Sequence, residues 1–125
     1  MRFMMMVMGD KDYERGTPPP PELMVAIGAL GQEMARAGKM VQQGGLAPSA
    51  MGALLDLENG TIRVTDGPFS ESKEVIGGFA ILEAAGKTEA VELARRFLQV
   101  HADVLGPSYH TRLEVRQLFE APSRA

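Results

Sequence analysis

Residues 77–119 read GGFAILEAAGKTEAVELARRFLQVHADVLGPSYHTRLEVRQLF and decide the fold. Within them, residues 88–105 carry apolar side chains at helical spacing on one face and charged side chains on the other. This pattern is typical of an amphipathic helix. The flanking residues 77–84 and 112–119 are short, rich in apolar side chains and bounded by turn residues, which favours strands. The stretch therefore predicts a strand, a helix and a strand in succession.

A second unit of the same kind comes earlier in the chain. Residues 2–8 predict a strand with apolar side chains on both faces, and residues 39–43 predict another, which two glycines break. Between them, residues 20–37 predict a helix, because proline suits the first turn and apolar residues recur at helical spacing. Gly28 and Gly31 weaken this helix, and their small size suits the close approach of another element. The polar stretch before the helix ends in four prolines and cannot continue a helix.

A hairpin joins the two units. Residues 51–58 alternate apolar and polar side chains, residues 61–66 do the same, and Asn59 and Gly60 separate the two segments. An Asn-Gly pair between two alternating segments is a strong signal for a two-residue hairpin turn. Residues 67–75 follow as a loop.

The predicted order is therefore β-α-β, a β-hairpin and β-α-β. This order predicts a ferredoxin-like α+β sandwich, in which the helices cover one face of the sheet and leave the other open. A strand that is apolar on both faces needs cover on both. We therefore expect the open face to pack against a second copy, giving a homodimer by sheet-to-sheet packing.

Composition sets the broad class of the protein. The 125 residues are 45% hydrophobic and 23% charged, which suits one globular domain over residues 1–120, with a flexible tail at 121–125. The absence of cysteine excludes disulfides, thiolate catalysis and cysteine metal sites. A net charge of −3 argues against a nucleic-acid partner. No apolar run approaches the ~20 residues of a membrane span, and we expect a cytoplasmic protein.

Asp66 is the first candidate for chemistry. Strand alternation places it beside Ile62 and Val64 on one apolar face, where the pKa of a carboxyl group can be raised. A turn aspartate usually accepts from the backbone N–H two residues on, but here that residue is Pro68, which has none. Two interpretations stay open. Asp66 either bonds locally, to the N–H of Phe69 or another side chain, or faces a ligand as a catalytic group.

His101 is the second candidate, at the centre of the apolar face of the predicted helix 88–105. It lies beside Phe97 and Leu105 on that face, and a buried imidazole there needs a hydrogen-bond partner. One interpretation is a core histidine bonded to a backbone carbonyl. The other pairs it with the Asp66 carboxylate for general acid–base catalysis.

The loop after Asp66 supplies candidate ligand-binding residues. Lys73 can neutralise an anionic ligand, and a solvated ion pair with Glu74 is the alternative. Gly78 opens a strand, where a missing side chain indicates close approach by a ligand or by another backbone. No ligand spacing or nucleotide fingerprint is present, so we expect neither a metal nor a cofactor. The candidates for ligand binding are Gly67, Pro68, Phe69, Lys73 and Gly78.

The stretch VTDGPFSESKE at residues 64–74, followed by Gly77, Gly78 and Phe79, resembles the signature of the YCII-related proteins. More narrowly, it resembles the branch named for its Asp-Gly-Pro-Phe (DGPF) motif. Four further segments carry the same resemblance, which extends over nearly the whole chain. They are Gly9-Asp10, Gly44-Gly45-Leu46, Phe97-Leu98-Gln99-Val100-His101 and Glu114-Val115-Arg116.

The resemblance implies a ferredoxin-like fold that dimerises as an α/β barrel, with a pocket near the Asp-Gly-Pro-Phe loop. In YCII-like proteins a His–Asp pair is a suggested active site, and members of the branch are often encoded beside extracytoplasmic-function sigma factors. Two hypotheses follow for this chain. It is either a small cofactor-free enzyme using Asp66 and His101, or a non-catalytic ligand-binding or regulatory dimer linked to sigma-factor-controlled transcription.

Overall fold

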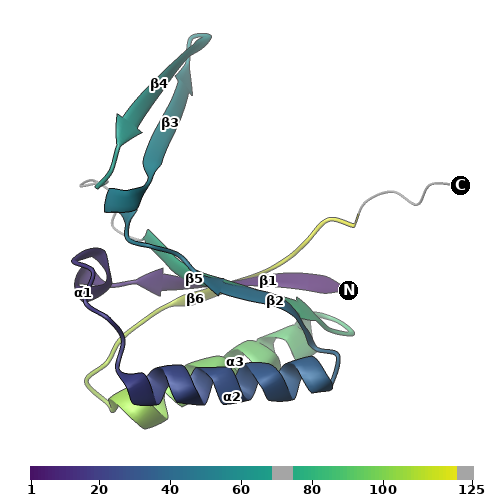
Figure 1. Cartoon of the computed structure of the whole chain (residues 1–125). Helices are drawn as coiled ribbons and strands as arrows, with labels where there is room; N and C mark the ends of the chain where they lie inside the picture. Colours follow the sequence, from purple (N-terminus) through teal and green to yellow (C-terminus); the bar gives the residue numbers. More distant parts are fainter. Residues whose placement is uncertain (69–74, 121–125) are drawn as a thin grey trace, which may run out of the picture.

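A four-stranded antiparallel sheet forms the body of the protein in the computed structural model, which describes residues 1–68 and 75–120 (Figure 1). The strands lie in the order β2-β5-β1-β6, so the first strand of the chain is central. Their bounds are Arg2–Gly9 for β1, Met40–Gly45 for β2, Val75–Glu83 for β5 and Leu113–Gln117 for β6. This mixed α+β architecture is compatible with the ferredoxin-like fold that the sequence predicts.

Two long helices, α2 (Pro21–Arg36) and α3 (Lys87–Leu105), cover one face of this sheet (Figure 1). Phe3 and Met5 of β1 point to the helices and are buried, as are Ala80 and Leu82 of β5. Alternation along each strand selects these side chains for the core. The remaining buried members of the core cluster are Leu30, Met34, Ala84, Ala90, Leu93 and Ala94. Among the described residues, no helix is long and apolar enough to cross a bilayer.

The other face of the sheet, which we call the open face, is also apolar at its centre. It carries Met4 and Met6 of β1 opposite Ile81 and Phe79 of β5, and all four side chains are half-buried. Gly44 of β2 pairs with Phe79, and a Cβ atom at Gly44 would lie 3.0 Å from the Phe79 ring. The prediction that glycines end β2 at residue 43 is therefore wrong, because Gly44 makes room for that ring and the strand continues to residue 45.

A two-stranded hairpin, which we call the arm, rises from the body on the side away from the helices (Figure 1). It consists of β3 (Ala53–Glu58) and β4 (Thr61–Asp66), joined by Asn59 and Gly60. Both turn residues have positive φ, 52° and 77°, as a type I′ turn requires. The predicted hairpin is confirmed.

Two short elements lie between the predicted ones. The one-turn helix α1 (Lys11–Glu14) interrupts the polar stretch after β1, and its N-cap Asp10 accepts a hydrogen bond from the Tyr13 N–H at 2.8 Å. The 3-10 turn η1 (Ser49–Met51) leads from β2 into the arm. Both elements pack at the foot of the arm, where they form part of the candidate site.

Candidate functional site

The end of β4 rests against η1 at the foot of the arm. The backbone N–H of Gly67 donates to the carbonyl oxygen of Gly52 at 2.9 Å. A Cβ atom at Gly67 would collide with the carbonyl oxygen of Ser49, so only a glycine permits this approach of two backbones. The Asp66-Gly67-Pro68 segment is thus fixed by main-chain contacts, with a cis peptide bond between Gly67 and Pro68.

Glu14 ties η1 to α1 from the other side. Its carboxylate accepts hydrogen bonds from the Ser49 N–H at 2.9 Å and from the Ser49 hydroxyl at 2.5 Å. These donors hold the pKa of the Glu14 carboxyl group below its usual value. The neighbouring Tyr13 donates its hydroxyl to the carbonyl oxygen of Leu46, and burial raises the pKa of that phenol. The foot of the arm is therefore a polar scaffold of satisfied groups.

Glycines let this scaffold close around the Tyr13 ring. A Cβ atom at Gly9 would overlap the ring, and one at Gly77 would lie 3.5 Å from it and 3.3 Å from the Gly9 backbone. At Gly78 a Cβ atom would lie 3.3 Å from the carbonyl oxygen of Gly44. The approach expected at the predicted ligand-binding residue Gly78 is thus made by a backbone, that of β2.

Asp66 stands on this scaffold at the end of β4. It pairs with Ala53 in the hairpin register and shares its face with Ile62 and Val64, as strand alternation predicts. Its side chain is exposed, and none of the described residues makes a hydrogen bond with it. A carboxylate so placed accepts hydrogen bonds from a bound cation, amine or hydroxyl group.

His101 lies elsewhere, as a buried residue of α3. It is 6% exposed, and its Nδ1 lies 2.9 Å from the carbonyl oxygen of Phe97. Because a carbonyl oxygen only accepts, Nδ1 carries a proton and donates it to this oxygen. The Phe97 ring lies 4.7 Å away, and the Tyr109 ring is stacked at 6.1 Å between centroids. The imidazole of His101 therefore has a structural role, in which it contacts two aromatic rings and donates to one backbone carbonyl.

The structure does not bring Asp66 and His101 together within one chain. His101 belongs to α3, which covers one face of the sheet, whereas Asp66 belongs to the arm, which rises on the other side (Figure 1). Among the described residues, no hydrogen bond or ion pair joins their side chains. The candidate ligand-binding residues Phe69 and Lys73 lie outside the described residues.

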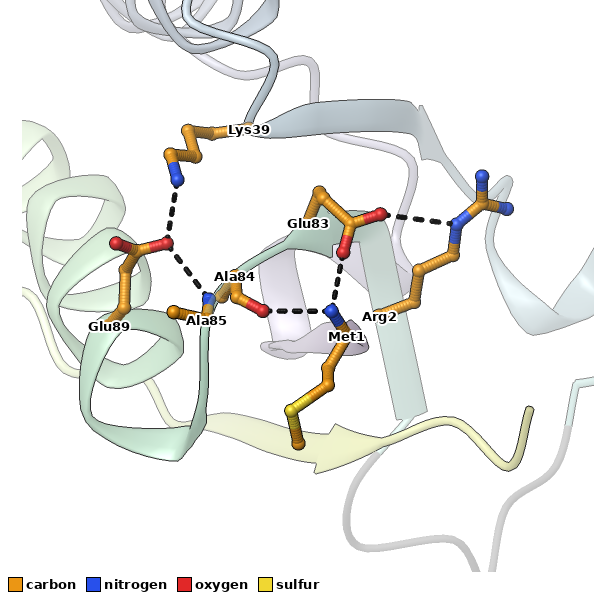
Figure 2. A network of polar contacts seen from close by, with 7 residues as sticks. All are labelled: Met1, Arg2, Lys39, Glu83, Ala84, Ala85 and Glu89. Atoms are coloured by element: carbon orange, nitrogen blue, oxygen red, sulfur yellow. Dashed lines mark hydrogen bonds and ion pairs between the residues drawn. The ribbon is translucent and has the colours of Figure 1, made fainter.

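A second polar cluster lies at the other end of the sheet, where β1 begins and β5 ends (Figure 2). Glu83 accepts from the Met1 amino group at 2.6 Å and lies 3.7 Å from Nε of Arg2. Close by, Glu89 accepts from Lys39 at 2.8 Å and from the Ala85 N–H at 3.2 Å. These partners lower the pKa of both carboxyl groups, so each remains ionised and is already neutralised by its own cation.

An open cavity of about 400 Å³ adjoins this cluster. Its lining residues come from the two chain-terminal segments and the end of β5, namely Met1, Arg2, Glu83, Leu118, Phe119 and Glu120. It lies far along the sheet from Asp66, so it is not the pocket that the sequence predicts. Within residues 1–68 and 75–120, no group of three potential metal ligands from His, Cys, Asp and Glu lies together.

Sequence reasoning did not identify Tyr13, Glu14 or Ser49. Glu14 and Ser49 are 35 positions apart, and no local pattern pairs them. One signal was available: Asp10 stands three residues before Tyr13, which is the spacing of an N-cap to the N–H that it accepts from.

Comparison with known proteins gives two findings. A family model described as the YCII-related domain matches residues 1–106. An uncharacterised protein of Rhizobium meliloti (strain 1021) is 34% identical over 73 residues, which are 58% of this chain and 59% of that relative. The chain thus matches less than two thirds of that relative's length.

Proposed function

Because the chain belongs to the YCII-related domain family, we propose that it is a small-molecule-binding domain whose central binding group is the Asp66 carboxylate. One observation carries this proposal. The backbone around Asp66 is held by Gly67 and by the contact of Glu14 with Ser49, yet the carboxylate itself makes no hydrogen bond within the described part of the chain. A polar group that a fixed scaffold presents without a structural partner is suited to binding.

The surroundings of Asp66 set the class of ligand. On its own face of the arm, Asp66 lies opposite Ala53. Along β4, the next side chains on that face are Val64 and then Ile62. A carboxylate at the end of an apolar row suits a ligand with a cationic or hydrogen-bond-donating group and an apolar body. Placement of such a ligand beside Pro68 agrees with the pocket that the Asp-Gly-Pro-Phe resemblance implies.

We also propose that the protein is a homodimer, in which the open faces of the two copies pack against each other. Met4, Met6, Phe79 and Ile81 give that face an apolar centre in the middle of the sheet. On β6, beside this centre, Glu114 and Arg116 form an ion pair of 3.7 Å. An apolar centre with a charged rim is the usual make-up of an interface between protein subunits.

Catalysis and regulation make different use of the same site. In an enzyme, Asp66 would act as general acid or base towards the bound molecule without His101, which lies on the helix side of the sheet. In the regulatory alternative, which the resemblance links to sigma-factor-controlled transcription, the molecule binds and is released without chemical change. A chemical analysis of the ligand after incubation therefore distinguishes catalysis from regulation.

The test is a thermal-shift screen of small metabolites against the wild type, Asp66→Asn and Asp56→Asn. Asp56 is the matched control, because it lies on the same arm but on the opposite face, paired with Arg63. We expect at least one compound that stabilises the wild type and the control but not Asp66→Asn. Mass spectrometry of that compound after incubation then distinguishes turnover from binding. A screen in which Asp66→Asn responds like the wild type to every compound would contradict the proposal.

A further inference from the structure

The arm leaves an apolar surface without cover. Every residue of β3 and β4 is exposed, on both faces of the hairpin. One face carries four large apolar side chains, which we call the arm row, and they form two cross-strand pairs. The pairs are Leu55 with Val64 and Leu57 with Ile62.

A two-stranded hairpin with no cover is marginally stable in water. The arm row is a contiguous apolar surface, and its side chains are among the most exposed large hydrophobic ones of the chain. The opposite face of the arm is more polar, because it carries Asp56 opposite Arg63 and Glu58 opposite Thr61. This difference between the faces indicates that the face with the arm row is buried against another surface.

The exposed surface of the chain exceeds that of a compact protein of its mass. A compact chain of 13.5 kDa exposes about 6,500 Å², whereas this chain exposes 9071 Å². The arm contributes to this excess, because every residue of its two strands is exposed.

The direction of the arm identifies what covers it. The arm rises on the same side of the sheet as the open face, away from α2 and α3 (Figure 1). A second copy packed on the open face therefore stands beside the arm. Both apolar surfaces that the single chain leaves bare, the open face and the arm row, are then turned to one partner.

We propose that the arm is an intersubunit arm, whose row of Leu55, Leu57, Ile62 and Val64 packs against a second copy of this chain. This inference rests on the proposed dimer and adds a contact that sheet packing alone does not require. Asp66 ends the same face of the arm, so its carboxylate lies at the edge of the contact. The binding site consequently adjoins the partner, and each dimer holds two such sites.

Thiol labelling tests the arm contact, since the chain has no cysteine and a single introduced thiol is then the only one. The variants are Leu57→Cys on the arm row and Leu54→Cys on the other face of the same strand. In one isolated chain Leu57 is 75% exposed and Leu54 46%, so the thiol at 57 would react with a maleimide dye faster. In the dimer we expect the reverse order, with the thiol at 57 at least tenfold slower. Val64→Cys and Thr65→Cys form a second pair with the same expectation.

The mass of each variant in solution, from light scattering, separates the possible outcomes. A dimer in which the thiol at 57 is the slower one supports the arm contact. A dimer in which the thiol at 57 is the faster one overturns the arm contact and leaves the sheet-packed dimer standing. A monomeric wild type overturns both, whichever thiol reacts faster.

Discussion

The Glu14 carboxylate accepts two hydrogen bonds from Ser49, one from the backbone N–H at 2.9 Å and one from the hydroxyl at 2.5 Å. This contact joins α1 to η1, and η1 in turn receives the end of β4 at Gly67. The position of Asp66 therefore depends on a residue 52 places earlier in the sequence. Contacts between residues far apart in the sequence can in this way fix a side chain at the end of a strand.

The first prediction concerns Glu14→Gln. The two donors from Ser49 lower the pKa of Glu14 below its ordinary 4.5. A lowered folded-state pKa adds stability above pH 4.5, and this stability is lost as the pH falls through the folded-state pKa. The free energy of unfolding, from urea titrations, should thus be lower for the variant at pH 7. The gap to the wild type should close on acidification below pH 4.5. A gap that is the same at pH 7 and pH 3 would contradict this role.

The second prediction concerns Gly67→Ala. The new methyl group would collide with the backbone of η1, so we expect the free energy of unfolding to fall by about 1–3 kcal/mol. Gly28→Ala is the control, because nothing lies within 4 Å of a Cβ atom there and the position is inside α2. That variant should gain about 0.5–1 kcal/mol from helix propensity. Equal effects of the two substitutions in urea denaturation would refute the close approach at Gly67.

The third prediction separates His101 from the binding site. His101→Phe keeps an aromatic ring beside the Phe97 ring and loses one hydrogen bond to a backbone carbonyl, so its cost in unfolding free energy should stay under about 1.5 kcal/mol. His101→Ala empties a buried site and should cost about 2–5 kcal/mol. Ligand binding by the phenylalanine variant should equal that of the wild type. Loss of binding or turnover in a stably folded His101→Phe protein would restore His101 to the mechanism.

The fourth prediction tests the open face as an interface. Met6→Asp puts a charge at its apolar centre, opposite Phe79, and should convert the dimer into a monomer at micromolar concentration. Val25→Asp is the control, since Val25 is an exposed apolar residue of α2, away from the open face. It should remain a dimer. Light scattering on both variants gives the masses directly, and a dimeric Met6→Asp would exclude this interface.

Local patterns were sufficient for the main elements of the fold. Asn59 and Gly60 take the two positive φ values of the predicted turn, and the helix expected at residues 88–105 is α3. The helix α1 escaped prediction because one turn of four residues has no periodicity to detect. The extent of β2 also escaped prediction, because the Phe79 ring over Gly44 is a cross-strand contact and leaves no mark on the local sequence.

The candidate site was predictable only in part, for the same reason. Strand alternation fixed the face on which Asp66 lies, since the register follows from the turn. Its proposed pairing with His101 needed the relative placement of the arm and α3, which depends on the whole sheet. A glycine in the sequence indicates that another group can approach closely, but it does not say which group does so. At Gly31 that group is the Gln43 side chain, whereas at Gly28 no group lies within 4 Å of a Cβ atom.

Isothermal titration tests the role of Asp66 most directly. It would measure the affinity of one compound found in the screen for the wild type, for Asp66→Asn and for Asp56→Asn. A hydrogen bond to a charged group contributes about 1.5–3 kcal/mol, so Asp66→Asn should weaken binding roughly 10- to 150-fold. Asp56→Asn, on the opposite face of the arm, should bind as the wild type does. Equal affinity in all three proteins would contradict the assignment of Asp66 as the binding group.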